Sequence, residues 1–170
     1  MVLVTNSTCI IYLAKVGRLG LLKAVFKRVL MPREVYTEAV KRGKERGFID
    51  AEIVEKAIEK GLIEVKKLSE VQKKEAERLC SLAAIGKGEA EAIILARDLK
   101  SELVIDDAVA LGVAKLYGLQ TLWTTSLILK AVRRGAITKR EGRRIIEDLV
   151  GAGYRLTGDV LVELLRGLEQ

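Results

Sequence analysis

The chain contains no histidine among its 170 residues. Without imidazole, every mechanism that uses it as a general base, a general acid or a metal ligand is excluded. Only two cysteines are present, Cys9 and Cys80, and they form no CxxC motif, so neither a zinc cluster nor a disulfide framework is expected. Cys9 lies in an apolar stretch and is predicted to be a buried thiol. One proline and 4% aromatic residues leave Val, Ile, Leu and Ala to build the core.

Long apolar runs are also missing. No stretch approaches the roughly 18 consecutive apolar residues that a membrane-spanning helix needs. Hydrophobic residues make up 49% of the chain and charged residues 31%, a balance typical of a folded globular protein. A length of 170 residues fits one domain with a substantial core. We therefore expect a single domain over residues 1–170, in a soluble protein of the cytoplasm.

Positive charge is in excess. Lysine and arginine number 30 against 23 acidic residues, which gives a formal charge of +7. The basic residues gather within 41–46, at Arg133-Arg134 and within 139–144. This excess favours a polyanionic partner such as RNA. The alternative interpretation is that these groups are solvated helix faces, rich in lysine and glutamate.

Short apolar runs alternate with segments of helical periodicity, which indicates an α/β fold. Such alternation predicts a three-layer arrangement: a mostly parallel central sheet of about four strands, with helices on both faces. The expected strands cover residues 2–5, 62–65, 103–105 and 119–123, with a brief strand or extended segment at 29–31. From about 138 to 168 the chain is expected to be all-helical, so that a core of about residues 1–135 is followed by a helical tail.

Turn and capping signals place several boundaries. Capping boxes are expected at Ser69 with Gln72 and at Thr138 with Glu141. The other expected boundaries are a cap at Ser7 or Thr8, a helix opened by Pro32 and running to about Lys41, a mobile loop over 43–47, a glycine break over 86–88 before a helix over 89–99, and a cap within 124–126.

Polar side chains follow two of the expected strands. Asn6 ends the first strand, and Asp106 and Asp107 end the strand over 103–105. Ligands bind at the carboxyl ends of parallel strands, where helix N-termini converge. Glu89 opens a helix after the glycine break, and Glu38 lies on the helix that Pro32 begins. Oxygen ligands without nitrogen or sulfur partners suit Mg²⁺ or Mn²⁺.

Four acidic positions spread over a hundred residues are a weak signal by spacing alone. Asp and Glu are ordinary capping residues at helix N-termini. Glu34 lies one turn before Glu38 and shares its face, but a capping or surface role is the simpler interpretation for it. Glu91 lies two residues beyond Glu89, on a different face of the helix, and a surface role is expected.

Four segments in order resemble one family. They are VTNSTCIIYLAKVGRLGLL from residue 4, MPREVYTEAV from residue 31, GKGEAEAIILA from residue 86 and LVIDDAVA from residue 103. In order, spacing and element type they resemble the PIN-domain family. They look closest to a branch of prokaryotic PIN-like proteins with Gly-Glu at the third acidic position and, in this chain, Asn at the first. The resemblance covers residues 2 to about 135, and the helical tail is also similar.

The resemblance implies a metal-dependent ribonuclease that uses Mg²⁺ or Mn²⁺. Many PIN proteins are toxins of toxin–antitoxin pairs and are usually dimeric, so RNA, a small antitoxin protein and a second copy of the chain are the implied partners. By position, the family's acidic ligands fall on Glu38, on Glu89 and on Asp106 or Asp107, and the first position falls on Asn6. Ser7 matches a small hydroxyl residue that often follows the first acid, and we place it with Thr124 and Thr125 among the substrate-binding residues.

This chain departs from the family pattern at two places. Asn6 keeps a carbonyl oxygen but removes a negative charge and the stronger ligand. The hydroxyl residue often found two positions before the last acid is replaced by Val104 or Ile105. The alternative function is therefore a catalytically weakened PIN-like domain that binds RNA or protein. An unrelated nucleotide-binding protein is a weaker hypothesis, because no GxxxxGK[ST] or GxGxxG motif follows a strand.

Overall fold

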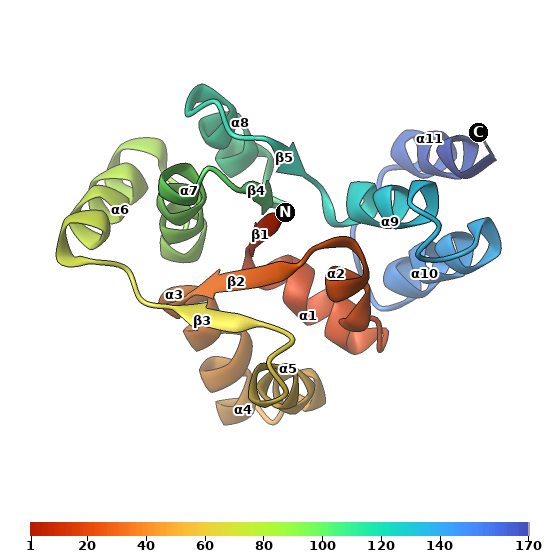
Figure 1. Cartoon of the computed structure of the whole chain (residues 1–170), viewed down its shortest axis with the longest axis horizontal. Coiled ribbons are helices and arrows are strands. Elements are labelled where there is room, and N and C mark those ends of the chain that lie inside the picture. Colours follow the sequence, from red (N-terminus) through yellow and green to blue (C-terminus); the bar gives the residue numbers. More distant parts are fainter. Residues whose placement is uncertain (170) are drawn as a thin grey trace.

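The computed structural model describes residues 1–169, and a five-stranded sheet runs through them (Figure 1). Every strand pairing is parallel, and the strand order is β3-β2-β1-β4-β5. The chain therefore winds outward in one direction from β1 through β2 to β3, then returns to the other side of β1 for β4 and β5. The strands are β1 (Val2–Thr5), β2 (Arg28–Pro32), β3 (Glu64–Lys66), β4 (Glu102–Val104) and β5 (Thr121–Leu122).

Helices cover both faces of this sheet, which confirms the predicted α/β class. In Figure 1, α6, α7 and α8 lie on one side and α1, α2, α9 and α10 on the other. The helical elements are α1 (Ser7–Lys15), α2 (Gly20–Val25), α3 (Arg33–Tyr36), the π-helical segment η1 (Thr37–Lys41), α4 (Arg42–Glu45), α5 (Ile49–Glu59), α6 (Glu70–Ala83), α7 (Lys87–Leu99), α8 (Ala108–Leu116), α9 (Thr124–Arg133), α10 (Lys139–Gly151) and α11 (Gly158–Glu169).

Alternation along the strands divides the interior into two cores. Successive residues of a strand point to opposite faces, so Leu3 packs into the core shared with α1, α2, α5, α9 and α10, whereas Val4 packs into the core under α6, α7 and α8. Both residues are fully buried. A strand buried on both faces needs a continuous apolar run, which is why the central strands were recognisable from sequence.

The strand count differs from the sequence prediction of about four. The segment expected as a brief strand at 29–31 is β2, a full member of the sheet that pairs with both β1 and β3. The expected strand over 62–65 is shorter and begins later, as the edge strand β3. None of the helices within residues 1–169 is long and apolar enough to cross a membrane.

Two capping boxes confirm the sequence prediction. Ser69 and Gln72 exchange side-chain to backbone hydrogen bonds at the start of α6, and Thr138 and Glu141 do the same for α10. The expected cap within 124–126 is wrong: Trp123 is the N-cap residue of α9, and its side chain makes no capping hydrogen bond.

The helix after β2 also differs from expectation. Pro32 ends β2 and precedes the helix, which begins at Arg33 rather than at Pro32. The helix does not end near Lys41 but continues through Glu45, so the first half of the expected loop over 43–47 is helical. Gly43 is buried, and a Cβ there would lie 2.7 Å from the Ala51 Cβ. This glycine therefore allows close packing of α4 on α5 rather than mobility.

A π-helical turn interrupts this helix at Thr37–Lys41. A π turn adds a residue to the helical repeat and shifts the direction of the side chains that follow. Glu38 lies inside the turn. Its orientation is therefore not given by the simple one-turn relation to Glu34 that the sequence suggested.

Candidate active site

The winding direction of the sheet reverses between β1 and β4. In open parallel sheets, this reversal point at the carboxyl ends of the strands is where ligands bind. Asn6 directly follows β1, and its backbone N–H donates to the Val104 carbonyl at the end of β4 (3.2 Å). Asp106 follows two residues later. The fold thus brings the ends of two distant segments together at the position where a site is expected.

Asn6 is almost completely buried, with 1% of its surface exposed. Its Oδ1 accepts a hydrogen bond from the Cys9 backbone N–H (3.2 Å), so Asn6 caps α1, and the expected cap at Ser7 or Thr8 is wrong. Its Nδ2 has no hydrogen-bond partner among the described residues. An aspartate here would cap the helix equally well and keep a second oxygen. Asparagine has a donor in place of that oxygen.

Glu38 and Glu89 lie together beside the first turn of α7. A Cβ on Gly88 would lie 2.7 and 2.8 Å from the two carboxylate oxygens of Glu38, and a Cβ on Gly86 would lie 2.1 Å from Oε2 of Glu89. The expected break before this helix is present at residues 84–86, but α7 begins at Lys87, two residues earlier than predicted, and Gly88 is a buried helical residue. The two glycines leave the space in which these carboxylates sit.

The surroundings of Glu38 disfavour its charged form. Burial raises the pKa of Glu38, the hydrogen bond with Ser7 lowers it, and the negative charges of Glu89 and Glu34 raise it further. Two neighbouring carboxylates in a half-buried place repel each other, and a divalent cation is the species that relieves such repulsion. Their oxygen donors suit Mg²⁺ or Mn²⁺.

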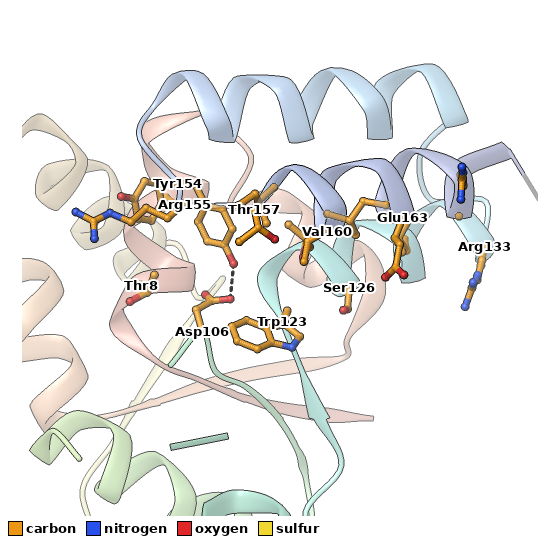
Figure 2. A pocket seen from close by; sticks show the side chains of 17 residues that line it. Thr8, Asp106, Trp123, Ser126, Arg133, Tyr154, Arg155, Thr157, Val160 and Glu163 are labelled. Atoms are coloured by element: carbon orange, nitrogen blue, oxygen red, sulfur yellow. Dashed lines mark hydrogen bonds between the residues drawn. The ribbon is translucent and has the colours of Figure 1, made fainter. Parts of the chain in front are cut away.

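Asp106 is held by three hydrogen bonds. Its Oδ1 accepts from the Thr124 backbone N–H (2.9 Å) and from the Tyr154 hydroxyl (2.6 Å), and its Oδ2 accepts from the Thr124 hydroxyl (2.6 Å). Figure 2 shows the Tyr154 ring pointing at the carboxylate. Burial raises the pKa of Asp106, and the hydrogen bonds from Thr124 and Tyr154 oppose that rise. The Tyr154 phenol itself has a raised pKa, caused by burial and by the charge of Asp106.

The neighbouring Asp107 has a different position. It is exposed, and its Oδ1 caps α8 by accepting from the Ala110 backbone N–H (2.8 Å). Asp106 also acts on the buried thiol of Cys9. Burial, and then the charge of Asp106, raise the pKa of this thiol to about 12. Cys9 is therefore neutral at physiological pH and cannot serve as a nucleophile.

The structure joins only some of the predicted site residues. Ser7 forms a hydrogen bond with Glu38, and the charge of Glu89 acts on Glu38. Asp106 instead interacts with Thr124, Tyr154 and Cys9. Within the described part of the chain, no three acidic or cysteine side chains gather closely enough to hold a metal ion. The predicted substrate residues Thr124 and Thr125 are buried.

Glu91 contradicts the expected surface role. It is 6% exposed, and its Oε2 accepts from the Glu34 backbone N–H (3.1 Å) near the start of α3. Burial raises the pKa of Glu91, and this hydrogen bond opposes the rise. The Glu34 side chain pairs with Arg42 and Lys87. Glu91 thus joins α7 to α3, the helix that leads into the turn bearing Glu38.

A family model of the PIN domain matches residues 2–170 of this chain. The chain belongs to the PIN-domain family. No curated protein matches it. PIN domains are in general nucleases that bind RNA and use divalent metal ions. This PIN domain has the α/β sheet expected of the family, and it carries an asparagine at the position where the resemblance places the first acidic residue.

Sequence reasoning missed two residues of this PIN domain's candidate site. Tyr154 comes from the segment between α10 and α11 and reaches Asp106 across 48 residues. Trp123 precedes α9 and lies beside Asp106 (Figure 2). Both line a cavity of about 1110 Å³. No local pattern marks Tyr154, but Trp123 stands out as the only tryptophan of the chain.

Proposed function

We propose that this PIN domain is a metal-dependent ribonuclease that hydrolyses phosphodiester bonds of RNA. The observation that carries the proposal is the pair Glu38 and Glu89, which lies against Gly86 and Gly88 and is linked to the end of β1 by the hydrogen bond between Glu38 and Ser7. The position of the pair agrees with the family's chemistry. Asp106, rather than the exposed Asp107, is the third candidate because it lines a cavity and Asp107 does not.

Glu38 and Glu89 would hold Mg²⁺ or Mn²⁺, which supplies an activated water and stabilises the leaving oxygen of a phosphodiester. Two carboxylates leave several coordination positions open, which suits ions that keep waters and bind substrate phosphate. The chain's own contribution is to position groups. Ser7 orients Glu38, and Thr124 and Tyr154 orient Asp106.

The experiment is cleavage of a labelled single-stranded RNA in Mn²⁺, in Mg²⁺ and in EDTA. We expect cleavage only with metal, and its loss in the Glu89→Gln variant. The matched control is Glu77→Gln, which removes the same charge from an exposed position on α6 and should leave cleavage unchanged. Metal-dependent cleavage that survives Glu89→Gln would refute the site, and the absence of any cleavage would refute the nuclease.

A second candidate function is a catalytically weakened PIN domain that binds RNA or protein. The arrangement of Asn6 favours it, because the side-chain oxygen caps α1 and the side-chain nitrogen is a donor without a partner among the described residues. Asn6→Asp discriminates between the two functions. If the asparagine has weakened the site, Asn6→Asp should increase Mn²⁺ affinity and cleavage by tenfold or more, since one added ligand charge strengthens the hold on a cation. If the wild-type protein is active and Asn6→Asp cleaves RNA at the same rate, the asparagine has not weakened the site.

The finer expectations of the family resemblance remain predictions. A toxin role with a small antitoxin protein and assembly as a homodimer are both consistent with membership of the family. Neither follows from a contact in residues 1–169. Measurement of the molecular mass in solution would test the homodimer, and co-purification with a small protein would test the antitoxin.

A further inference from the structure

The cavity that Asp106 lines is large. It has a volume of about 1110 Å³, more than the roughly 300–1,000 Å³ of a typical small-molecule pocket. Residues of α1, α9 and α11 and the segment 154–157 line it. Figure 2 shows Asp106 and Tyr154 toward the side of Thr8 and Arg155, Arg133 at the opposite end, and Trp123 near Asp106. The cavity is therefore long enough to hold more than a single reacting phosphate.

Trp123 has an exposed aromatic ring at this place. Its backbone carbonyl accepts from the Leu127 N–H and so belongs to the start of α9, while 37% of the residue's surface is exposed. The other cavity aromatics, Tyr12 and Tyr154, pack edge to face against each other with centroids 5.2 Å apart. Their hydroxyls donate to Gly153 and Asp106. Trp123 is thus the ring left available for stacking.

The charges along the cavity suit a phosphate chain. Arg133, Arg155 and Arg166 line it, and none of them forms an ion pair within the described residues. Besides Asp106, Glu163 is the acidic residue among the described residues that line the cavity. Guanidinium groups that make no ion pair with the described residues, and an aromatic ring open to solvent, are two elements with which proteins bind single-stranded nucleic acid: the first hold the backbone and the second stacks a base.

We propose that this cavity is a subsite for one unpaired nucleotide of the RNA, next to the bond that is cut. The base stacks on Trp123, and the flanking phosphates lie near the arginines. This inference rests on the proposed function in that it takes RNA as the substrate. Because a base paired in a duplex cannot turn into the cavity, the subsite selects single-stranded over double-stranded RNA.

The test uses the full chain in EDTA, so that binding is measured without cleavage. Trp123 is the only tryptophan, so intrinsic tryptophan emission reports on this cavity alone. An eight-nucleotide oligouridylate or oligoadenylate should quench it, and the same strand annealed to its complement should not. By fluorescence anisotropy of labelled RNA, Trp123→Ala should weaken binding by roughly 5- to 150-fold, the range expected for one stacked base, and Trp123→Phe should retain most of the affinity.

The control is Leu116→Ala on α8, where an exposed large apolar residue is removed away from the cavity, and binding should not change. RNA that binds equally to Trp123→Ala and leaves the emission of wild-type protein unchanged would overturn the subsite and leave the nuclease proposal intact. Quenching by RNA, without any metal-dependent cleavage, would support the subsite as an RNA-binding site and overturn the nuclease proposal. Emission that changes with self-association, and not with RNA, would assign the cavity to a protein contact and overturn the subsite.

Discussion

Gly88→Ala separates the role of Glu38 from the stability of the fold. The added Cβ would lie 2.7 Å from a Glu38 carboxylate oxygen, whereas ordinary contact begins at 3.4 Å. The carboxylate must therefore move by about 0.7 Å (3.4 − 2.7). Functional constellations tolerate displacements of only about 0.5 Å, and a displacement near 1 Å can cost about 100-fold in rate. We expect Mn²⁺ affinity and cleavage to fall by about 10- to 100-fold.

The same substitution should not destabilise the protein. Gly88 is helical with an ordinary backbone angle, and alanine in a helix is favoured over glycine by up to about 1 kcal/mol. The displaced atoms are the end of a flexible side chain, so this gain is offset only in part. Urea unfolding followed by circular dichroism should show unchanged or slightly increased stability. Wild-type affinity and cleavage in Gly88→Ala would refute the assignment of Glu38.

The control for this experiment is Gly112→Ala. Gly112 lies within α8, and a Cβ there meets no atom within 4 Å. Its replacement should add up to about 1 kcal/mol of stability through helix propensity alone. Metal affinity and cleavage should be unaffected, so any loss specific to Gly88→Ala comes from the contact with Glu38.

Two further predictions concern the buried carboxylates. The pKa of Glu91 in the folded protein lies above its ordinary value of 4.5, so ionised Glu91 lowers the stability of the fold. This loss of stability is absent below the pKa of the unfolded chain, and it develops as pH rises through the pKa of the folded protein. Glu91→Gln, which still accepts from the Glu34 N–H, should therefore gain stability relative to wild type as pH rises above the ordinary pKa of 4.5. Thermal melts in which the difference between the two proteins stays constant with pH, or changes in the opposite direction, would contradict this reasoning. Tyr154→Phe removes the 2.6 Å hydrogen bond to Asp106 and should lower the free energy of unfolding by about 1.5–3 kcal/mol, the range for hydrogen bonds to charged groups. Tyr12→Phe, which loses an exposed hydrogen bond to Gly153, is its control, and equal losses in the two variants would count against a special role for Tyr154.

The features that sequence predicted correctly are those set by neighbouring residues. Apolar runs located the strands because each central strand is buried on both faces, and the boxes at Ser69 and Thr138 follow from residues three positions apart. The misses depend on tertiary contact. Gly88 reads as a helix breaker until the carboxylate of Glu38 is placed against it. Glu91 reads as a surface residue until α3 packs beside it.

The composition of the candidate site came from the family resemblance, and its residues remain predictions. The resemblance pointed to Asn6, Glu38, Glu89 and the pair Asp106 and Asp107, but only the sheet order shows which strand ends adjoin. The choice between Asp106 and Asp107 needed the fold as well, because one faces Tyr154 and the other caps α8. No spacing rule could have supplied Tyr154, which arrives from 48 residues further along the chain.

The central claim is that Glu38 and Glu89 hold the divalent ion. Its most direct test is calorimetric titration of metal-free protein with Mn²⁺, alone and with a phosphorothioate RNA strand that supplies phosphate ligands. We expect Mn²⁺ to bind to wild type and to Glu77→Gln, and binding to be lost in Glu89→Gln. Equal binding by Glu89→Gln, or no binding by wild type even with the RNA strand present, would contradict it.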